Sequence, residues 1–300
     1  MATYYNDNTV LYLNGEIVRA ATASMDLYSQ SLHYGYSVFE GIRSYKNIHG
    51  KTEIFKPVAH FERLRHSAEA LNLPYHWSVE QLIAATYEVL ERNQLQDAYI
   101  RPVVFAPANM SFIVNTESYI TIQAWEMQPF LGEKLLRVMT SSFQRPNPKG
   151  FKITAKAAGH YVNSILASQE AKALGFDEAL LNDMNGYVAE GPGANIFYEK
   201  DGCLVTPPHG NILPGITRAT VFEICADLQV PVEEKLFTTE ELKEADAAFF
   251  CGTAAEVIGW ESLDDLPFKK QWSQSVGKTI QDAYKQKVIA KEYKQSLAIA

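Results

Sequence analysis

Lys156 is the side chain of this sequence whose setting best suits covalent chemistry. It lies in the segment 154–159 (TAKAAG), where small residues surround it and no other residue is charged. A lysine that packing removes from water has a lowered pKa, and its free amine can form a Schiff base with an aldehyde. A solvent-exposed surface lysine is the competing interpretation, because composition alone does not separate the two.

Two later segments could each present backbone N–H groups to an anion. Residues 213–217 (LPGIT) lead into a predicted helix, whose first amides lack partners and whose N-terminus is partially positive. Residues 252–255 (GTAA) follow a predicted buried strand and combine a glycine, a hydroxyl and two small residues. That composition suits a nest for phosphate or carboxylate. An ordinary connection between two elements is the alternative in both places.

Several common catalytic and nucleotide-binding motifs are absent from the sequence. It contains no GxxxxGK[ST] loop, no GxGxxG, no GxSxG and no HExxH. The sequence therefore predicts neither a P-loop, a Rossmann nucleotide site, an acyl-transfer serine nor a metal site. Cys203, Cys225 and Cys251 lie far apart, and we expect three buried thiols without redox regulation.

The composition is that of a globular protein with an acidic balance. Of the 300 residues, 47% are hydrophobic and 21% are charged, which argues against disorder. The net charge of -8 disfavours nucleic acid as the main partner, because phosphate binding needs clustered Lys and Arg. No apolar run approaches the ~20 residues of a membrane helix. Residues 1–7 show no secretory signal, so a cytoplasmic location is expected.

The first half of the chain contains clear local signals for hairpins and helices. Asn14-Gly15 accepts the positive φ angles of a type I′ turn and predicts a β-hairpin of residues 10–13 and 16–19. Ser78 with Gln81 forms a capping box, which predicts the start of a helix. The other expected elements are strands 42–45 and 52–55, helices around 61–71 and 82–90, and strands 99–105 and 119–125.

The second half mixes strands and helices without regular βαβ alternation, which favours an α+β fold. Its predicted elements are a strand at 136–141, helices at 160–174 and 220–228, turns at 185–186 and 201–202, a buried strand at 247–251 and a lysine-rich helix from about residue 274. Periodicity stops near 127–132. We therefore predict a small N-terminal domain of residues 1–126, an interdomain loop of 127–134 and a large C-terminal domain of 135–300.

Six ordered segments together resemble the branched-chain amino acid aminotransferases, a class IV (fold-type IV) family that uses pyridoxal 5′-phosphate (PLP). They are 33–43 (HYGYSVFEGIR), 99–102 (YIRP), 156–159 (KAAG), 185–191 (NGYVAEG), 213–218 (LPGITR) and 252–256 (GTAAE). The likeness runs from about residue 13 to residue 260. It implies a two-domain α+β fold with PLP at the domain interface.

The resemblance also implies cofactor roles for individual residues. Lys156 is similar to the lysine that binds PLP covalently and moves a proton at the substrate Cα. Glu190 is similar to the glutamate that faces the pyridine nitrogen, where a carboxylate keeps that nitrogen protonated. Tyr161 falls where the family has a tyrosine that is hydrogen-bonded to O3′ of the PLP ring. The expected phosphate-binding residues are Arg63, Ile216, Thr217 and Thr253.

On the substrate side, the resemblance implies an apolar pocket with one charged group at its rim. Tyr99 and the amides of Thr253 and Ala254 resemble the site for the α-carboxylate. Arg101 resembles the arginine that pairs with the side-chain carboxylate of glutamate. One pocket would then accept leucine, isoleucine or valine as well as glutamate.

Phe39 and Tyr34 are expected in the apolar wall, with the loop around 110–112 entering from a neighbouring subunit. Such sharing implies a homodimer or a larger homo-oligomer. The other expected partners are small molecules, and neither nucleic acid nor membranes are expected. The implied reaction is ping-pong. A branched-chain amino acid first gives up its amino group and is released as its 2-oxo acid. 2-Oxoglutarate then takes up the amino group and is released as glutamate, as in branched-chain amino acid biosynthesis.

Two positions depart from the family pattern and bear on substrate preference. Phe130 stands where a tyrosine is frequent, and His160 stands where some relatives have asparagine. D-amino acid aminotransferase, (R)-selective amine transaminase and aminodeoxychorismate lyase are rivals with the same fold, and a non-catalytic scaffold is a rival from another class. The pairing of residues 41–43 with 99–102 favours the branched-chain interpretation, and the intact set of cofactor residues argues against a scaffold.

Overall fold

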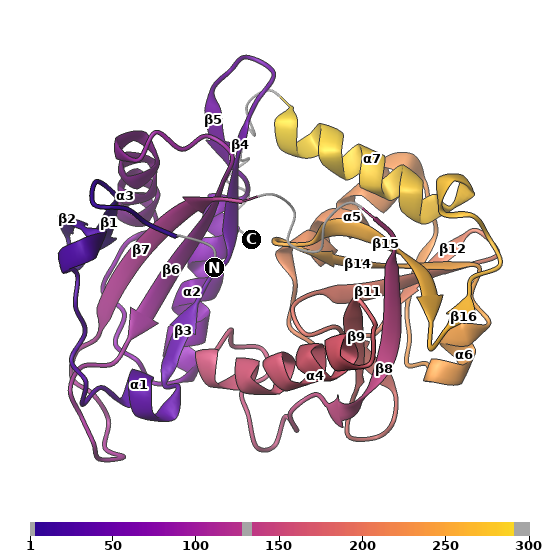
Figure 1. Ribbon diagram of the computed structural model, residues 1–300, viewed down its shortest axis with the longest axis horizontal. Helices are drawn as coiled ribbons and strands as arrows, with labels where there is room; N and C mark the ends of the chain where they lie inside the picture. The colour runs from indigo at the N-terminus through magenta and orange to yellow at the C-terminus, as the bar shows by residue number, and fades with distance from the viewer. Residues whose placement is uncertain (1–3, 128–133, 291–300) are drawn as a thin grey trace.

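The computed structural model describes residues 4–127 and 134–290, and its strands form two sheets that face each other (Figure 1). The seven strands of the first sheet lie between residues 10 and 126, and the nine strands of the second lie between 136 and 267. Helices pack on both sheets without regular βαβ alternation, which confirms the α+β fold class. The exact domain boundaries stay a prediction.

The first sheet has the order β2-β1-β7-β6-β4-β5, and β3 also pairs with β6. Its strands are β1 (Val10–Leu13), β2 (Glu16–Arg19), β3 (Ser37–Phe39), β4 (Ile42–Lys46), β5 (Thr52–Ile54), β6 (Ala98–Phe105) and β7 (Tyr119–Glu126). Asn14 and Gly15 join β1 to β2 with φ angles of 49° and 101°, as their types predict. The predicted pairing of β4 with β5 is confirmed.

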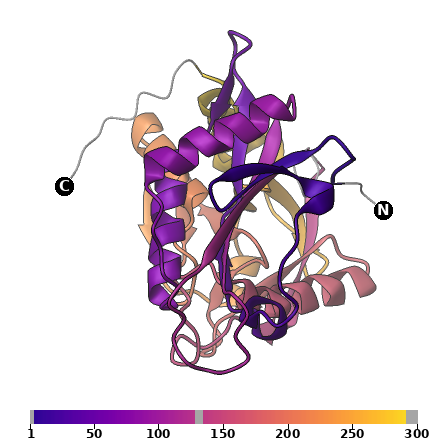
Figure 2. The ribbon, with the colours of Figure 1, turned by 90° about the vertical axis from the view of Figure 1, so that its left-hand side faces the viewer.

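Helices α2 (Pro57–Ala70) and α3 (Val79–Arg92) cover one face of this sheet, and α1 (Gln30–Tyr34) precedes β3 (Figure 2). The capping box of Ser78 and Gln81 is present at the start of α3. Side chains of a strand alternate between its two faces. In β6, Ile100 and Val104 pack into the core beneath the helices, whereas Tyr99 and Arg101 face the second sheet.

The second sheet has the order β10-β9-β8-β15-β14-β11-β12-β13. An additional pairing of β10 with β11 closes six of these strands into a ring, which leaves those strands no free edge. The strands are β8 (Leu136–Gln144), β9 (Glu178–Asn182), β10 (Val188–Glu190), β11 (Asn195–Lys200), β12 (Cys203–Thr206), β13 (Val232–Glu234), β14 (Ala247–Gly252), β15 (Glu256–Leu263) and β16 (Leu266–Pro267).

Four helices pack on the second sheet, namely α4 (Tyr161–Ala173), α5 (Ile216–Leu228), α6 (Thr239–Lys243) and α7 (Val276–Ile289). Helix α5 begins earlier than the predicted residue 220, because Gly215 already occupies the N-cap position. Helix α7 also contacts β4 of the first sheet (Figure 1). Within residues 4–127 and 134–290, no helix combines the length and apolar character needed to cross a membrane. The cytoplasmic location stays a prediction.

The three cysteines are free, and they differ in exposure. Cys225 and Cys251 are fully buried, as predicted. The prediction for Cys203 is wrong, because this residue is half-buried. It opens β12 directly after the Asp201-Gly202 turn, where the sheet meets solvent.

Candidate active site

A cavity of about 2010 Å³ lies between the two sheets and contains nearly all of the predicted site residues. It is large enough for a cofactor together with a small substrate. The predicted residues that line it are Phe39, Arg63, Tyr99, Arg101, Lys156, Tyr161, Glu190, Ile216, Thr217, Thr253 and Ala254.

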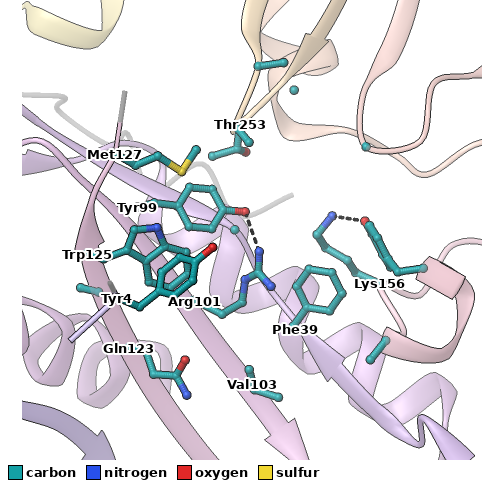
Figure 3. Close-up of a pocket in the computed structure, with 18 of the residues that line it drawn as sticks. Tyr4, Phe39, Tyr99, Arg101, Val103, Gln123, Trp125, Met127, Lys156 and Thr253 are labelled. Atoms are coloured by element: carbon teal, nitrogen blue, oxygen red, sulfur yellow. Dashed lines mark hydrogen bonds between the residues drawn. The ribbon is translucent and has the colours of Figure 1, made fainter. Parts of the chain in front are cut away.

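Lys156 reaches the cavity from a segment that is tied to the first half of the chain. Its backbone N donates to Ser67 Oγ at 3.0 Å, and its carbonyl oxygen accepts from the Phe39 N–H at 3.0 Å. The side-chain Nζ donates to the Tyr161 hydroxyl at 2.6 Å and lies 5.0 Å from the centre of the Phe39 ring (Figure 3). This half-buried amine is therefore not the solvent-exposed surface lysine that the sequence left open.

Glu190 ends β10, and a set of donors fixes its buried carboxylate. Oε1 forms an ion pair with Arg145 Nη2 at 2.9 Å and accepts a hydrogen bond from the Leu213 N–H at 3.1 Å. Oε2 accepts from Asn195 Nδ2 at 2.8 Å. Burial raises the pKa of Glu190, and the neighbouring Arg145 guanidinium opposes that rise. The carboxylate is thus oriented before any ligand binds.

Arg63 is held at the cavity wall by Glu40, a buried acid that sequence reasoning did not assign to the site. Its Nε and Nη2 donate to the two Glu40 carboxylate oxygens at 2.6 and 2.8 Å, and its Nη1 donates to the Pro214 carbonyl at 2.9 Å. His60 Nδ1 lies 2.7 Å from Glu40 Oε2. Burial alone would raise the pKa of Glu40, but Arg63 and His60 bring it down to about 2. The ion pair therefore persists at neutral pH.

The first turn of α5 lies beside Arg63. Ile216 and Thr217 are its first residues, so their N–H groups have no acceptor inside the helix. Gly215 packs closely against the side chain of Asn195, and a Cβ added at this position would lie 1.9 Å from Asn195 Oδ1. Asn195 Nδ2 also donates to the Leu213 carbonyl at 3.0 Å, which ties this loop to Glu190. This helix start and Arg63 together can bind a phosphate group.

Arg101 lies among aromatic side chains and is not neutralised. Its Nη2 donates to the Tyr99 hydroxyl at 3.1 Å (Figure 3). Its guanidinium carbon lies 4.5 Å from the centre of the Phe39 ring and 5.2 Å from that of Tyr99. Among the described residues it has no acidic partner, and its buried Nε has no hydrogen-bond acceptor. A guanidinium in this condition suits a carboxylate that arrives from outside.

The same face of the first sheet provides further lining residues that sequence reasoning missed. They are Val103, Gln123, Trp125 and Met127 (Figure 3). Tyr99 pairs with Trp125 and Arg101 pairs with Gln123 across β6 and β7, so each pair shares a face. Strand alternation within 119–125 could have indicated Gln123 and Trp125 only once this register was known.

Tyr34 does not line the cavity of its own chain. It is the last residue of α1, and its ring packs against the ring of Phe112 with the centroids 5.4 Å apart. Phe112 is 89% exposed and Tyr34 is 47% exposed, so the pair lies on the surface. Of the two positions that depart from the family pattern, His160 lines the cavity and Phe130 lies outside the described residues.

Comparison with known proteins finds one family over most of the chain. Residues 37–263 match the family described as amino-transferase class IV. The branched-chain-amino-acid aminotransferase of Salmonella typhimurium is 38% identical over 283 residues, which cover 91% of each chain. The protein with the same description from Pseudomonas aeruginosa is 39% identical over 281 residues, covering 92% of this chain and 91% of its own.

Solved structures agree with this result. The branched-chain aminotransferase of Thermoproteus uzoniensis with norvaline has a TM-score of 0.91 at 37% identity, covering 95% of this chain and 96% of that chain. The branched-chain amino acid aminotransferase of Thermobaculum terrenum in its PLP-form has a TM-score of 0.89 at 31% identity, covering 96% of each chain.

Proposed function

The chain belongs to the amino-transferase class IV family, and from this premise we propose that it exchanges amino groups between L-leucine, L-isoleucine or L-valine and 2-oxoglutarate. The observation that carries the substrate assignment is Arg101. This unneutralised guanidinium is packed on Phe39 and Tyr99 in the same cavity as Lys156. One pocket thus contains both an apolar wall, which suits an aliphatic side chain, and a cation, which suits the distal carboxylate of glutamate.

PLP is the cofactor of class IV aminotransferases, and the residues of the cavity fit it. The buried carboxylate of Glu190 suits a protonated ring nitrogen. Arg63 and the first-turn amides of α5 suit the phosphate, with the Thr253 hydroxyl on the same cavity wall. Lys156 suits covalent attachment. When bound, PLP supplies an electron sink for the electron pair left on the substrate Cα.

The proton transfer falls to Lys156 in this proposal. Its Nζ removes the proton from the substrate Cα and returns it to the cofactor side. Tyr161 orients that amine through the 2.6 Å hydrogen bond. Arg145 and Asn195 fix the direction in which Glu190 presents its carboxylate.

Substrate binding uses groups from both sheets. The Tyr99 hydroxyl and the N–H groups of Thr253 and Ala254 are proposed to bind the α-carboxylate that all substrates share. Arg101 is proposed to bind the second carboxylate of glutamate and 2-oxoglutarate, and Phe39 to contact aliphatic side chains. These groups line one cavity, which supports the assignment.

A panel of amino donors with 2-oxoglutarate tests the proposed function. We expect glutamate to form with L-leucine, L-isoleucine and L-valine at rates far above those with D-alanine or an aryl amine. A preference for D-alanine would favour D-amino acid aminotransferase activity. A preference for the aryl amine would favour (R)-amine transaminase activity, and either result contradicts the proposal.

We also propose that the chain forms a homo-oligomer through the surface around Tyr34 and the loop 110–114. Phe112, Ile113 and Val114 are 89%, 71% and 72% exposed, an apolar exposure typical of an interface. Sedimentation of the wild type and of Phe112→Ser tests this proposal. We expect a dimer or larger assembly that the substitution weakens, with a parallel loss of activity. A fully active wild-type monomer would contradict it.

A further inference from the structure

Glu256 has an unusual backbone conformation at the edge of the cavity. It pairs with Gly252 across β14 and β15, so that Thr253, Ala254 and Ala255 form the turn between them. Its φ angle is +56°, in the left-handed region. Glycine adopts this conformation without steric cost, whereas an L-residue with a long side chain does not. A requirement for the turn alone would therefore favour glycine at position 256.

The side chain of Glu256 crosses from the second sheet to the first. Its Oε1 accepts a hydrogen bond from the Tyr45 hydroxyl at 2.9 Å and lies 3.1 Å from Arg43 Nη1. Arg43 and Tyr45 both belong to β4, and all three residues are buried. The Nη2 of Arg43 donates to the Met127 carbonyl at 2.9 Å, so the same guanidinium also holds the end of the substrate wall.

A second link runs from this cluster to the phosphate side of the cavity. Tyr284, on α7, is buried, and the side chains of Tyr45 and Thr217 lie close to its hydroxyl. Thr217 belongs to the first turn of α5. The cluster therefore touches both segments that can bind anions, the turn 253–255 and the start of α5.

We propose that Glu256 is a positioning residue, whose carboxylate ties the turn 253–255 to β4 so that the turn presents its N–H groups to the bound anions at a fixed distance from the substrate wall. This role rests on the proposed function, because it deepens the assignment of that turn. Thr253 and Tyr99 line the same cavity (Figure 3), and Tyr99 is the part of the substrate wall that the turn must face. The strained backbone at Glu256 persists because its side chain makes contacts that glycine cannot make.

Glu256→Gly tests the role, with Glu256→Gln as the conservative variant. Glycine relaxes the backbone but frees the turn, whereas glutamine keeps an oxygen that can accept the hydrogen bond from the Tyr45 hydroxyl. We expect Glu256→Gly to raise the KM for leucine and for glutamate alike by about tenfold, because small misplacements of a binding group weaken binding strongly. The affinity for PLP should fall by a similar factor. Glu256→Gln should stay within about threefold of wild type in both.

Asp265→Gly is the matched control. Asp265 also has a positive φ, +64°, and forms an ion pair with Arg137 at 2.7 Å, but it is exposed and does not line the cavity. We expect it to leave the KM and the PLP affinity unchanged. Tyr45→Phe removes one hydrogen bond to Glu256 Oε1 and should raise the KM about threefold. It serves as the test if Glu256→Gly does not fold.

PLP affinity, measured by fluorescence titration of the apoprotein, separates this inference from the proposed function. A wild type that binds PLP but does not transaminate branched-chain amino acids would overturn the function, while the titration would still decide the role of Glu256. An unchanged KM and PLP affinity in Glu256→Gly overturn the inference. A loss of kcat in that variant at constant KM and constant PLP affinity overturns it as well.

Discussion

The hydroxyl of Tyr99 occupies the space beside Gly41 that a side chain at position 41 would fill. A Cβ added at Gly41 would lie 2.0 Å from that hydroxyl oxygen, far inside van der Waals contact. Tyr99 has little room to move. Its ring packs on Trp125 with the centroids 5.2 Å apart, and its hydroxyl accepts a hydrogen bond from Arg101. The glycine between β3 and β4 therefore sets the position of a proposed substrate-binding group on β6.

Gly41→Ala should displace the Tyr99 hydroxyl and weaken substrate binding. Overpacking of this kind costs about 1–3 kcal/mol, so we expect kcat/KM for leucine to fall by about ten- to a hundredfold. Steady-state kinetics measure the change. Gly150→Ala is the control, since its Cβ would meet only Asn147 O at an ordinary 3.6 Å. Unchanged kinetics in Gly41→Ala would show that Tyr99 can shift without loss.

Lys156→Ala should abolish turnover, because it removes both the covalent attachment and the group that carries the proton. We expect a loss of at least about a thousandfold in kcat with leucine and 2-oxoglutarate. Lys152→Ala provides the control, since Lys152 is an exposed lysine four residues earlier in the chain. If Lys156→Ala kept a tenth or more of the wild-type rate, Lys156 would not be the catalytic amine.

Arg101→Leu should separate the two substrate classes. A hydrogen bond to a charged group contributes about 1.5–3 kcal/mol, so kcat/KM for glutamate and 2-oxoglutarate should fall by about ten- to a hundredfold. Leucine has no second carboxylate, and its kcat/KM should change by less than about threefold. Arg101→Lys keeps the charge without the planar fork and should recover part of the loss. Equal losses for all substrates would instead make Arg101 a structural residue.

His160→Asn should change how stability depends on pH. Burial, and then the Arg145 guanidinium, lower the pKa of His160 to about 4 from its ordinary 6.5. Below pH 6.5 the unfolded chain therefore binds a proton here that the native state does not bind. The stabilising contribution is complete above that pH and is lost as the pH falls toward about 4.

Urea unfolding of both proteins from about pH 7 down to about pH 4 measures the effect. The wild type should lose up to about 3 kcal/mol of unfolding free energy relative to His160→Asn across this range. A difference between wild type and His160→Asn that stays constant with pH would contradict the assignment.

Local signals predicted the secondary structure well, because each depends on neighbouring residues. Asn14-Gly15 sets its own turn, and Ser78 with Gln81 caps α3 with its own side chains. The start of α5 was predicted too late, since Gly215 ends the loop by packing against Asn195, a residue of β11. That contact is long-range and leaves no local pattern.

The order of the motifs likewise predicted residues that the structure gathers around one cavity, with Tyr34 as the exception. The missed residues depend on partners far along the chain. Gln123 and Trp125 enter the cavity because β7 pairs with β6 in one register, and Glu40 matters because α2 brings Arg63 to it. Tyr34 was expected in the apolar wall, but α1 holds it at the surface of its own chain.

The amino-acid sequence by itself determined the chemical groups of this protein: an amine at Lys156, an acid at Glu190, cations at Arg63 and Arg101 and two turns that we propose bind anions. Residue type and short spacing single out Lys156 and the two turns, and the resemblance of the ordered motifs to one family points to the other three. Only the tertiary structure decided which groups meet. The packing of the two sheets joins Arg43 and Tyr45 to Glu256, more than two hundred residues later in the chain. Such contacts depend on the relative placement of whole sheets, which no short stretch of sequence encodes.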